Sequence, residues 1–134
     1  MKYILASQSP RRRELLGMLG ITFDIEPATG EERQIGDTPQ EIVQNLAAAK
    51  AREIAAHHAG EESIVIGADT IVVCEGEILG KPKDRADMER MIRMLSGRTQ
   101  RYTPAWRSTA SPEIQRNPTK YGYLPSAPAS IFIR

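Results

Sequence analysis

Short apolar runs alternate along this chain with segments that carry the start signals of helices. Tyr3–Ala6 is an apolar run of strand length, and the polar residues 7–9 end it. Ser9 then suits the N-cap of a helix, Pro10 suits its first position, and Gly20 follows its last apolar residues. This segment predicts the order strand, tight loop, helix.

The alternation continues to residue 57. Residues 22–27 resemble a second strand, and the polar residues 28–37 that follow are most simply a loop. The clearest helix start in the sequence comes next: Thr38 suits the N-cap, Pro39 takes the first position, and Glu41 completes a capping box. We expect this helix to run to about residue 57.

The next forty residues add a hairpin and a third helix. Two β-branched apolar runs, 63–67 and 70–74, flank an acid at Asp69, and a tight turn can join the second run to a short strand over 77–79. A helix then begins near residue 84, has apolar residues at i, i+3, i+4 and i+7, and ends at a glycine. The whole pattern predicts a mixed α/β fold.

The composition fits one small domain in which any charged site must be local. The 134 residues are 40% hydrophobic, enough to bury a core. Lys and Arg number 18 against 17 Asp and Glu, so the net charge of +1 predicts neither nucleic acid nor an anionic membrane as a partner. No apolar run approaches the roughly 18 residues of a membrane span, and the N-terminus lacks the order of a signal peptide, so we expect a cytoplasmic protein.

The single cysteine, Cys74, favours a buried thiol over a nucleophile, and excludes a disulfide framework or a cysteine-based metal cluster.

The character of the sequence changes at about residue 100. Residues 101–134 hold five of the nine prolines, five of the seven aromatic residues and five basic residues, but only one acid, Glu113. The tail therefore carries +4, which leaves −3 for residues 1–100. We expect a domain over residues 1–100 and a divergent, Pro- and Arg-rich tail of irregular structure over 101–134.

Positive charge is concentrated at the start of the first predicted helix. Unpaired N–H groups and the helix dipole already make such a start an anion site, and Arg11 and Arg12 are unfavourable there unless an anion compensates them. Guanidinium groups that bind phosphate would give such compensation. The alternative is a solvated basic helix start, and we expect Arg13 to be solvated in either case.

Two further charged residues stand where apolar neighbours predict burial. Lys50 lies within the apolar stripe of the second helix, so its ammonium must either extend to solvent, the commoner outcome, or meet an anion. Asp69 lies between two strand-like runs and needs hydrogen bonds, a cation or a metal, although an Asx-turn is an alternative. Lys81 and Glu32 also lie beside turns or in loops. This mixture of cations and carboxylates suits metal-assisted phosphate chemistry, without the glycine pattern of a P-loop.

Four blocks of the sequence resemble the Maf family of nucleoside triphosphate pyrophosphatases. In order, they are LASQSPRRREL, IVIGADTIV, LGKP and MLSGRT, and together they cover about residues 1–100. Within this family, Ser-Pro-Arg-Arg combined with Gly-Ala-Asp-Thr resembles the branch that acts on dTTP and UTP. Arg11 and Thr70 fall on positions that the family ties to the choice of base.

The resemblance implies a fold, a reaction and a set of site residues. The fold would be of the inosine triphosphate pyrophosphatase type, an elongated mixed sheet with flanking helices and a cleft between two lobes, the second lobe here incomplete. Asp69 would act as proton acceptor while water attacks the α-phosphorus, and Glu32 and Asp69 would hold Mg²⁺ or Mn²⁺. Residues expected to bind the nucleoside triphosphate are Ser7, Arg11, Arg12, Lys50, Thr70 and Lys81. A homodimer is a further expectation.

The sequence departs from the family after the fourth block. The family continues with a strand and then a further lobe that supplies a Gln or Glu to the substrate, and neither is recognisable in residues 100–134. A shift of reading frame near residue 100 is one hypothesis for this departure. The alternative to an active enzyme is a catalytically inert remnant that binds nucleotides or, through its Pro-rich tail, a partner protein.

Overall fold

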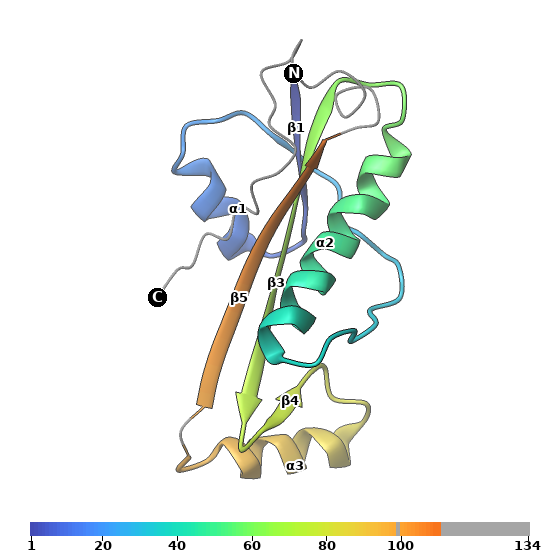
Figure 1. Cartoon of the computed structure of the whole chain (residues 1–134). Coiled ribbons are helices and arrows are strands. Elements are labelled where there is room, and N and C mark those ends of the chain that lie inside the picture. The colour runs from blue at the N-terminus through green and yellow to red at the C-terminus, as the bar shows by residue number, and fades with distance from the viewer. Residues whose placement is uncertain (99, 111–134) are drawn as a thin grey trace.

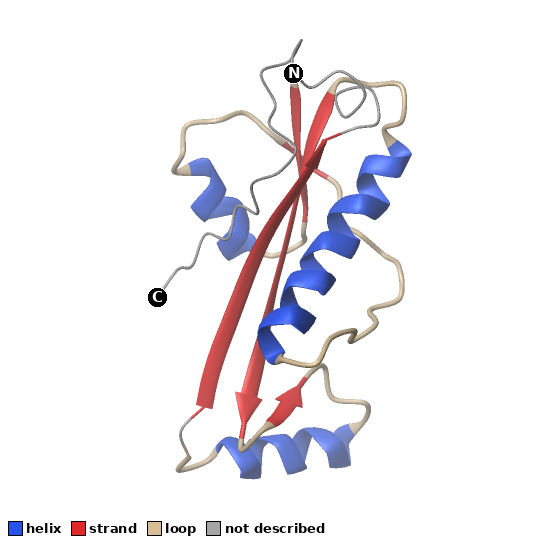
Figure 2. Cartoon of the chain, in the orientation of Figure 1, coloured by secondary structure: helices blue, strands red, loops and turns tan. Residues whose placement is uncertain are grey.

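The computed structural model describes residues 1–98 and 100–110, which form an α/β arrangement (Figures 1 and 2). The elements in chain order are β1 (Lys2–Ala6), α1 (Pro10–Gly17), β2 (Asp24–Ile25), α2 (Pro39–His57), β3 (Ser63–Cys74), β4 (Glu77–Leu79), α3 (Arg85–Leu95) and β5 (Gln100–Ala110). The prediction of a mixed α/β fold with flanking helices is confirmed. None of the described helices is long and apolar enough to cross a membrane.

The long strand β3 organises the sheet. β1 pairs with it in parallel over Ser63–Gly67, β4 pairs antiparallel from Val72 onward, and β2 pairs with β1. β5 runs antiparallel to β3 from residue 64 to residue 74 and occupies its whole opposite edge. β1 and β4 therefore share one edge of β3, and on that edge no described strand pairs with residues 68–71, which pair with β5 on the other edge. This gap leaves four residues of β3 open to other partners along one edge.

Helix α2 packs on one face of this sheet. Its start follows the predicted signal, because the Thr38 side chain accepts a hydrogen bond from the Glu41 backbone N–H at 3.2 Å. Its apolar residues form two buried clusters against β1, β3 and β5. An added Cβ at Gly67 would lie 2.1 Å from the Ala47 carbonyl oxygen, so glycine lets the helix approach β3 closely.

The other two helices border the sheet differently. α1 lies on the other side of the strands from α2 in Figure 1, and its cap is Ser9, whose side chain accepts from the Arg12 backbone N–H. α3 begins after the Asp84 cap and lies across the end of the sheet. None of its residues is buried, and Met88 and Ile92 on its predicted apolar stripe are exposed. The apolar spacing thus located α3 correctly without indicating how much of the stripe is covered.

Two strand predictions need correction. β2 has two residues instead of the six expected over 22–27, because only Asp24 and Ile25 pair with β1. The two runs on either side of Asp69 form one continuous strand, because β5 pairs with β3 without interruption on its other edge. The polar side chain of Asp69 therefore does not interrupt the strand.

Residues 100–110 are also more regular than predicted. They form β5, whereas we expected irregular structure from residue 101. Thr103 and Ala105 are buried, so alternate residues face the core, and the long free edge of β3 supplies backbone partners. Pro104 suits an outer strand, where its missing N–H need not serve a neighbour. The remainder of the predicted tail, 111–134, lies outside the described residues.

Candidate functional site

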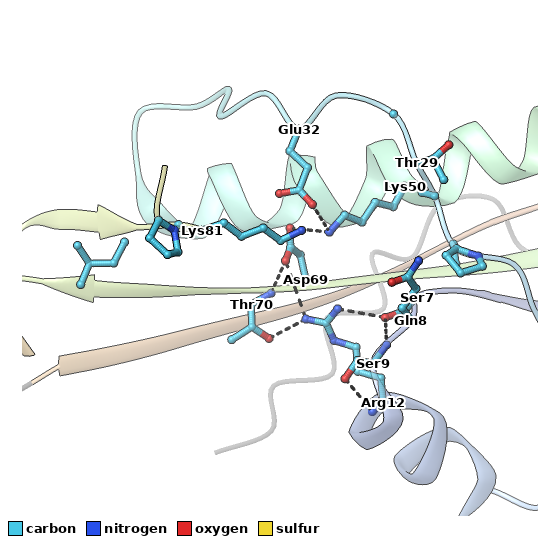
Figure 3. A pocket seen from close by; sticks show the side chains of 17 residues that line it. Ser7, Gln8, Ser9, Arg12, Thr29, Glu32, Lys50, Asp69, Thr70 and Lys81 are labelled. Atoms are coloured by element: carbon cyan, nitrogen blue, oxygen red, sulfur yellow. Dashed lines mark hydrogen bonds and ion pairs between the residues drawn. The ribbon is translucent and has the colours of Figure 1, made fainter. Parts of the chain in front are cut away.

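A polar cavity of about 940 Å³ lies beside the gap in the edge of β3 (Figure 3). Its walls come from the turn after β1, the start of α1, the loop after β2, α2, β3 and the segment after β4. The residues that line it are Ala6, Ser7, Gln8, Ser9, Arg12, Pro27, Ala28, Thr29, Gly30, Glu32, Lys50, Asp69, Thr70, Leu79, Gly80, Lys81 and Pro82. The lining residues come from five segments of the sequence: 6–12, 27–32, 50, 69–70 and 79–82.

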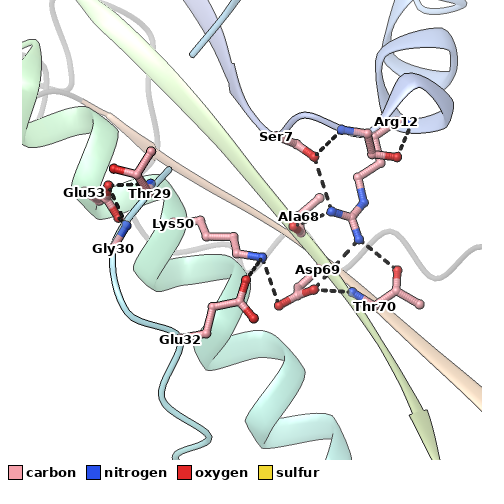
Figure 4. A network of polar contacts seen from close by, with 11 residues as sticks. Ser7, Arg12, Thr29, Gly30, Glu32, Lys50, Glu53, Ala68, Asp69 and Thr70 are labelled. Atoms are coloured by element: carbon pink, nitrogen blue, oxygen red, sulfur yellow. Dashed lines mark hydrogen bonds and ion pairs between the residues drawn. The ribbon is translucent and has the colours of Figure 1, made fainter. Parts of the chain in front are cut away.

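Arg12 fills part of the gap with hydrogen bonds from its guanidinium (Figure 4). Nη1 donates to the Ala68 carbonyl oxygen at 2.9 Å and to Ser7 Oγ at 3.3 Å, and Nη2 donates to Thr70 Oγ1 at 3.1 Å. The side chain is only 19% exposed, and Nη2 lies 3.9 Å from Asp69 Oδ1. Burial lowers the pKa of Arg12, with the Asp69 and Glu32 carboxylates acting in the opposite direction. An arginine nevertheless stays protonated in proteins, so it brings a fixed positive charge to the cavity.

Lys50 joins the two carboxylates of the cavity. Its Nζ lies 3.0 Å from Glu32 Oε1 and 3.3 Å from Asp69 Oδ2. The lysine is 19% exposed, so it meets anions instead of extending into solvent. The hydrogen bond from Lys50 lowers the pKa of Glu32 in spite of its partial burial, and nearby Lys81 and Arg12 add to this effect.

Asp69 is held from both sides. Residues alternate along β3, so Asp69 shares with Gly67 and Ile71 the face that α2 covers, and its side chain is 12% exposed. One carboxylate oxygen contacts Lys50, and the other accepts the Thr70 backbone N–H at 2.7 Å. The local hydrogen bond and the cation partners thus occur together, and they fix the direction of this carboxylate.

The turn after β1 and the segment after β4 complete the walls. Ser7 is buried, and its hydroxyl accepts from the Ser9 backbone N–H at 3.3 Å as well as from Arg12. Lys81 is exposed on the wall formed after β4. The lining thus contains three cations, Arg12, Lys50 and Lys81, and two carboxylates. This excess of positive charge favours an anionic ligand.

The structure brings together every predicted site residue except Arg11. Arg11 is 70% exposed, pairs with Glu14 at 3.3 Å, and is not among the residues that line the cavity. The helical turn directs Arg12 inward instead, while Arg13 is exposed, as expected. The seven residues that meet at the cavity are Ser7, Arg12, Glu32, Lys50, Asp69, Thr70 and Lys81.

Sequence reasoning missed the residues that hold the loop after β2. Glu53, one helical turn after Lys50, accepts backbone hydrogen bonds from Thr29 and Gly30. The available signal was the spacing, since residues three apart lie on the same side of a helix. The sequence of a polar loop does not indicate which helix the loop packs against.

The carboxylates of the cavity suit a divalent metal that also binds phosphate. Glu32 and Asp69 lie within reach of the same ammonium group, so their oxygens converge on one region. Within residues 1–98 and 100–110, no group of three His, Cys, Asp or Glu side chains could hold a metal by itself. Mg²⁺ commonly takes one or two carboxylates, with substrate phosphates and water as its other ligands. The two carboxylates fit that pattern.

A comparison with known families matches most of the chain. A family model described as Maf-like protein matches residues 2–119. The chain belongs to the Maf family. The resemblance predicted from the four sequence blocks is therefore confirmed, and the match extends beyond the last block.

Curated relatives match about 70% of the chain. A dTTP/UTP pyrophosphatase of Geotalea uraniireducens (strain Rf4) is 55% identical over 95 residues, which are 70% of this chain and 48% of that protein. A dTTP/UTP pyrophosphatase of Anaeromyxobacter dehalogenans (strain 2CP-C) is 50% identical over 97 residues, 72% of this chain and 47% of its own. The chain thus spans about half the length of these relatives. The crystal structure of a nucleoside-triphosphatase / dITP/XTP pyrophosphatase from Mycobacterium abscessus aligns at a TM-score of 0.47 and 19% identity, covering 82% of this chain and 66% of that one.

Proposed function

We propose that this protein hydrolyses nucleoside triphosphates, dTTP and UTP in particular, to the nucleoside monophosphate and pyrophosphate. The observation that carries the proposal is the juxtaposition of three cations with Asp69 and Glu32 in one cavity. Cations neutralise a triphosphate, and a fixed carboxylate can accept a proton from water. The curated relatives described as dTTP/UTP pyrophosphatases support the choice of reaction and substrates.

Asp69 is the proposed proton acceptor. As water attacks the α-phosphorus, a new O–P bond forms, the anhydride bond to the β-phosphate breaks, and pyrophosphate leaves. The proton of the water passes to the Asp69 carboxylate. Its contacts with Lys50 and the Thr70 N–H hold that carboxylate in one orientation, which favours proton transfer at a fixed point.

The cations and the serine have a binding role in this proposal. Arg12 and Lys50 lie at opposite sides of Asp69, and Lys81 lies on the wall after β4, so phosphate groups in the cavity would meet positive charge on several sides. The Ser7 hydroxyl orients Arg12. Thr70, which lines the cavity, and Arg11, which does not, are the residues we propose for the choice of base.

Glu32 and Asp69 are the proposed ligands of Mg²⁺ or Mn²⁺. When bound, such a metal stabilises the charge that develops on the phosphate oxygens. Glu32 suits this role because hydrogen bonding from Lys50 lowers its pKa, so it is ionised at neutral pH.

Pyrophosphate release tests the proposed reaction. We expect the wild-type chain to release pyrophosphate from dTTP and UTP with Mg²⁺ or Mn²⁺, and Asp69→Asn to lower kcat about 10²- to 10⁴-fold. Asp24→Asn is the matched control, because Asp24 forms a surface ion pair with Lys2 and should leave kcat unchanged. Folded wild-type protein that binds dTTP without hydrolysing it would contradict the proposal and favour the nucleotide-binding remnant.

A further inference from the structure

The loop between β2 and α2 runs antiparallel alongside α2 and is bound to it at successive turns (Figures 1 and 2). Contacts occur near both ends and in the middle of the helix, and residue numbers rise in the loop as they fall in the helix. The pairs are Glu26 with His57 and His58, Thr29 and Gly30 with Glu53, Glu32 with Lys50, and Ile35 with Asn45. The helix therefore serves as a template for a loop that has no secondary structure of its own.

Glu53 makes the most extensive backbone contact in this series. Its Oε1 accepts the Thr29 N–H at 2.8 Å and the Gly30 N–H at 3.1 Å, and its Oε2 accepts the Gly30 N–H at 3.0 Å. Figure 4 shows the carboxylate directed at both amides. A charged acceptor makes stronger hydrogen bonds than a neutral one, so this contact restrains two consecutive peptide units.

The contact lies directly beside Glu32. Gly30 and Glu32 are two residues apart, a span of at most about 7 Å in an extended chain. On the helix, Glu53 and Lys50 are one turn apart and lie on the same side. An anchored backbone at Gly30 therefore limits where the Glu32 carboxylate can reach, and places it 3.0 Å from Lys50 Nζ.

The absence of a side chain at Gly30 makes room for this contact. An added Cβ at Gly30 would lie 2.5 Å from Glu53 Oε2, so any larger residue would push the carboxylate away. The contact can therefore be disturbed from either partner: by removing the Glu53 carboxylate, or by adding one methyl group to the loop.

We propose that Glu53 is a positioning residue that acts through Glu32: by binding the Thr29 and Gly30 amides, it holds the loop so that Glu32 can serve as a metal ligand beside Asp69. The inference rests on the proposed function, since that function assigns the metal to these two carboxylates. Glu53 itself does not line the cavity. Its effect is transmitted through the backbone, in the manner of groups that orient metal ligands.

Binding of Mn²⁺ in the presence of a non-hydrolysable dTTP analogue, followed by electron paramagnetic resonance, tests this role without turnover. We expect Glu53→Ala and Gly30→Ala each to weaken Mn²⁺ binding about tenfold or more. In a Glu32→Ala background, Glu53→Ala should cause no further loss. Glu53→Gln, which keeps one acceptor oxygen, should recover part of the affinity.

Glu41→Ala is the matched control. Glu41 is another α2 glutamate that accepts a loop amide, from Asp37 at 2.8 Å, but it lies at the far end of the loop from Glu32. This variant loses part of a helix cap and should lower stability, yet it should leave Mn²⁺ affinity unchanged. Amide hydrogen exchange at Thr29 and Gly30 should quicken in Glu53→Ala and stay slow in Glu41→Ala.

Several results would overturn the positioning role. One is an Mn²⁺ affinity that is unchanged in Glu53→Ala, or reduced equally in Glu53→Ala and Glu41→Ala. Another is a further reduction of Mn²⁺ affinity when Glu53→Ala is added to Glu32→Ala. Absence of Mn²⁺ binding by the wild type would also overturn it. The proposed function fails separately, if the wild type releases no pyrophosphate. Mn²⁺ binding that follows the expected order in such a protein would keep the positioning role and refute only the hydrolysis.

Discussion

At the scale of single residues, Gly67 sets the distance between α2 and the central strand. A Cβ there would lie 2.1 Å from the Ala47 carbonyl oxygen and 2.9 Å from the Ala51 backbone nitrogen. Both atoms belong to the helix backbone, so no side-chain rotation can relieve the overlap. Since Lys50 lies between Ala47 and Ala51, the same close approach brings its ammonium to Asp69.

Gly67→Ala should therefore destabilise the protein. We expect the free energy of unfolding, from a urea titration, to fall by about 1–3 kcal/mol, the usual cost of overpacking a core. Gly17→Ala is the matched control, because Gly17 lies in a helix and a Cβ there meets nothing within 4 Å. It should leave stability unchanged or raise it slightly. Equal effects of the two substitutions would show that α2 can move away from β3 without cost.

Arginines 11 to 13 show what the sequence can and cannot predict about single side chains. Their charge at a helix start indicated an anion site, and Arg12 indeed lines the cavity. The sequence could not tell Arg11 from Arg12, because the direction of each side chain depends on where α1 packs. The free edge of β3 between β1 and β4, with the Ala68 carbonyl oxygen as acceptor, selects Arg12.

At the scale of elements, hydrogen bonds between ionised side chains link the end of α2 to the loop after β2. His58 donates from Nε2 to Glu26 at 2.6 Å and from Nδ1 to Glu61 at 2.9 Å. Both ring nitrogens carry a proton only in the charged imidazolium. Hydrogen bonds to Glu26 and Glu61 accordingly raise the pKa of His58, and those from His58 and His57 lower the pKa of Glu26. Lys2 also lies 3.5 Å from Glu61.

This cluster predicts a pH-dependent contribution to stability. The raised pKa of His58 means that its contribution is complete below about pH 6.5 and is lost as the pH rises through the folded-state value. The lowered pKa of Glu26 means that its contribution is lost only at acidic pH, below its ordinary value. We expect the Tm difference between wild type and His58→Gln to be largest near pH 5–6 and small at pH 9. A Tm difference independent of pH would contradict this account.

At the scale of the whole molecule, β5 decides whether residues 100–110 belong to the folded unit. Its buried Thr103 and Ala105 face α2 and β3, and Ala105 belongs to the same apolar cluster as Ile71. The amino-acid composition changes at about residue 100, but the sheet continues across this point. A strand with 11 paired residues along β3 should unfold with it.

Ala105→Asp tests this cooperativity. Burying an unpaired carboxylate under α2 should lower the free energy of unfolding of the whole chain by about 2–4 kcal/mol. Trp106 is the single tryptophan and lies in β5, so its fluorescence and the far-UV circular dichroism should change at the same urea concentration. Tyr102→Asp is the control, because Tyr102 is 60% exposed and should tolerate the charge. Separate transitions by the two probes would assign β5 to an independently unfolding tail.

The sequence by itself determined the helices, the family and the residue types that meet in the candidate site. Helix starts at Ser9, Thr38 and Asp84 depend on hydrogen bonds within three residues, so local sequence suffices for them. The residue types at Lys50 and Asp69 were informative for a similar reason: a charge among apolar neighbours requires a partner wherever it lies in the fold.

Only the tertiary structure decided how these parts combine. The continuity of β3, the inclusion of β5, the choice of Arg12 over Arg11, and the contact of Glu53 with Gly30 all depend on chain segments 23 or more residues apart. Such contacts form only where strand pairing and helix packing bring the segments together, and no pattern of neighbouring residues specifies that pairing. Local sequence therefore indicates which residue types the candidate site contains. Their arrangement depends on the gap between β1 and β4 along one edge of β3.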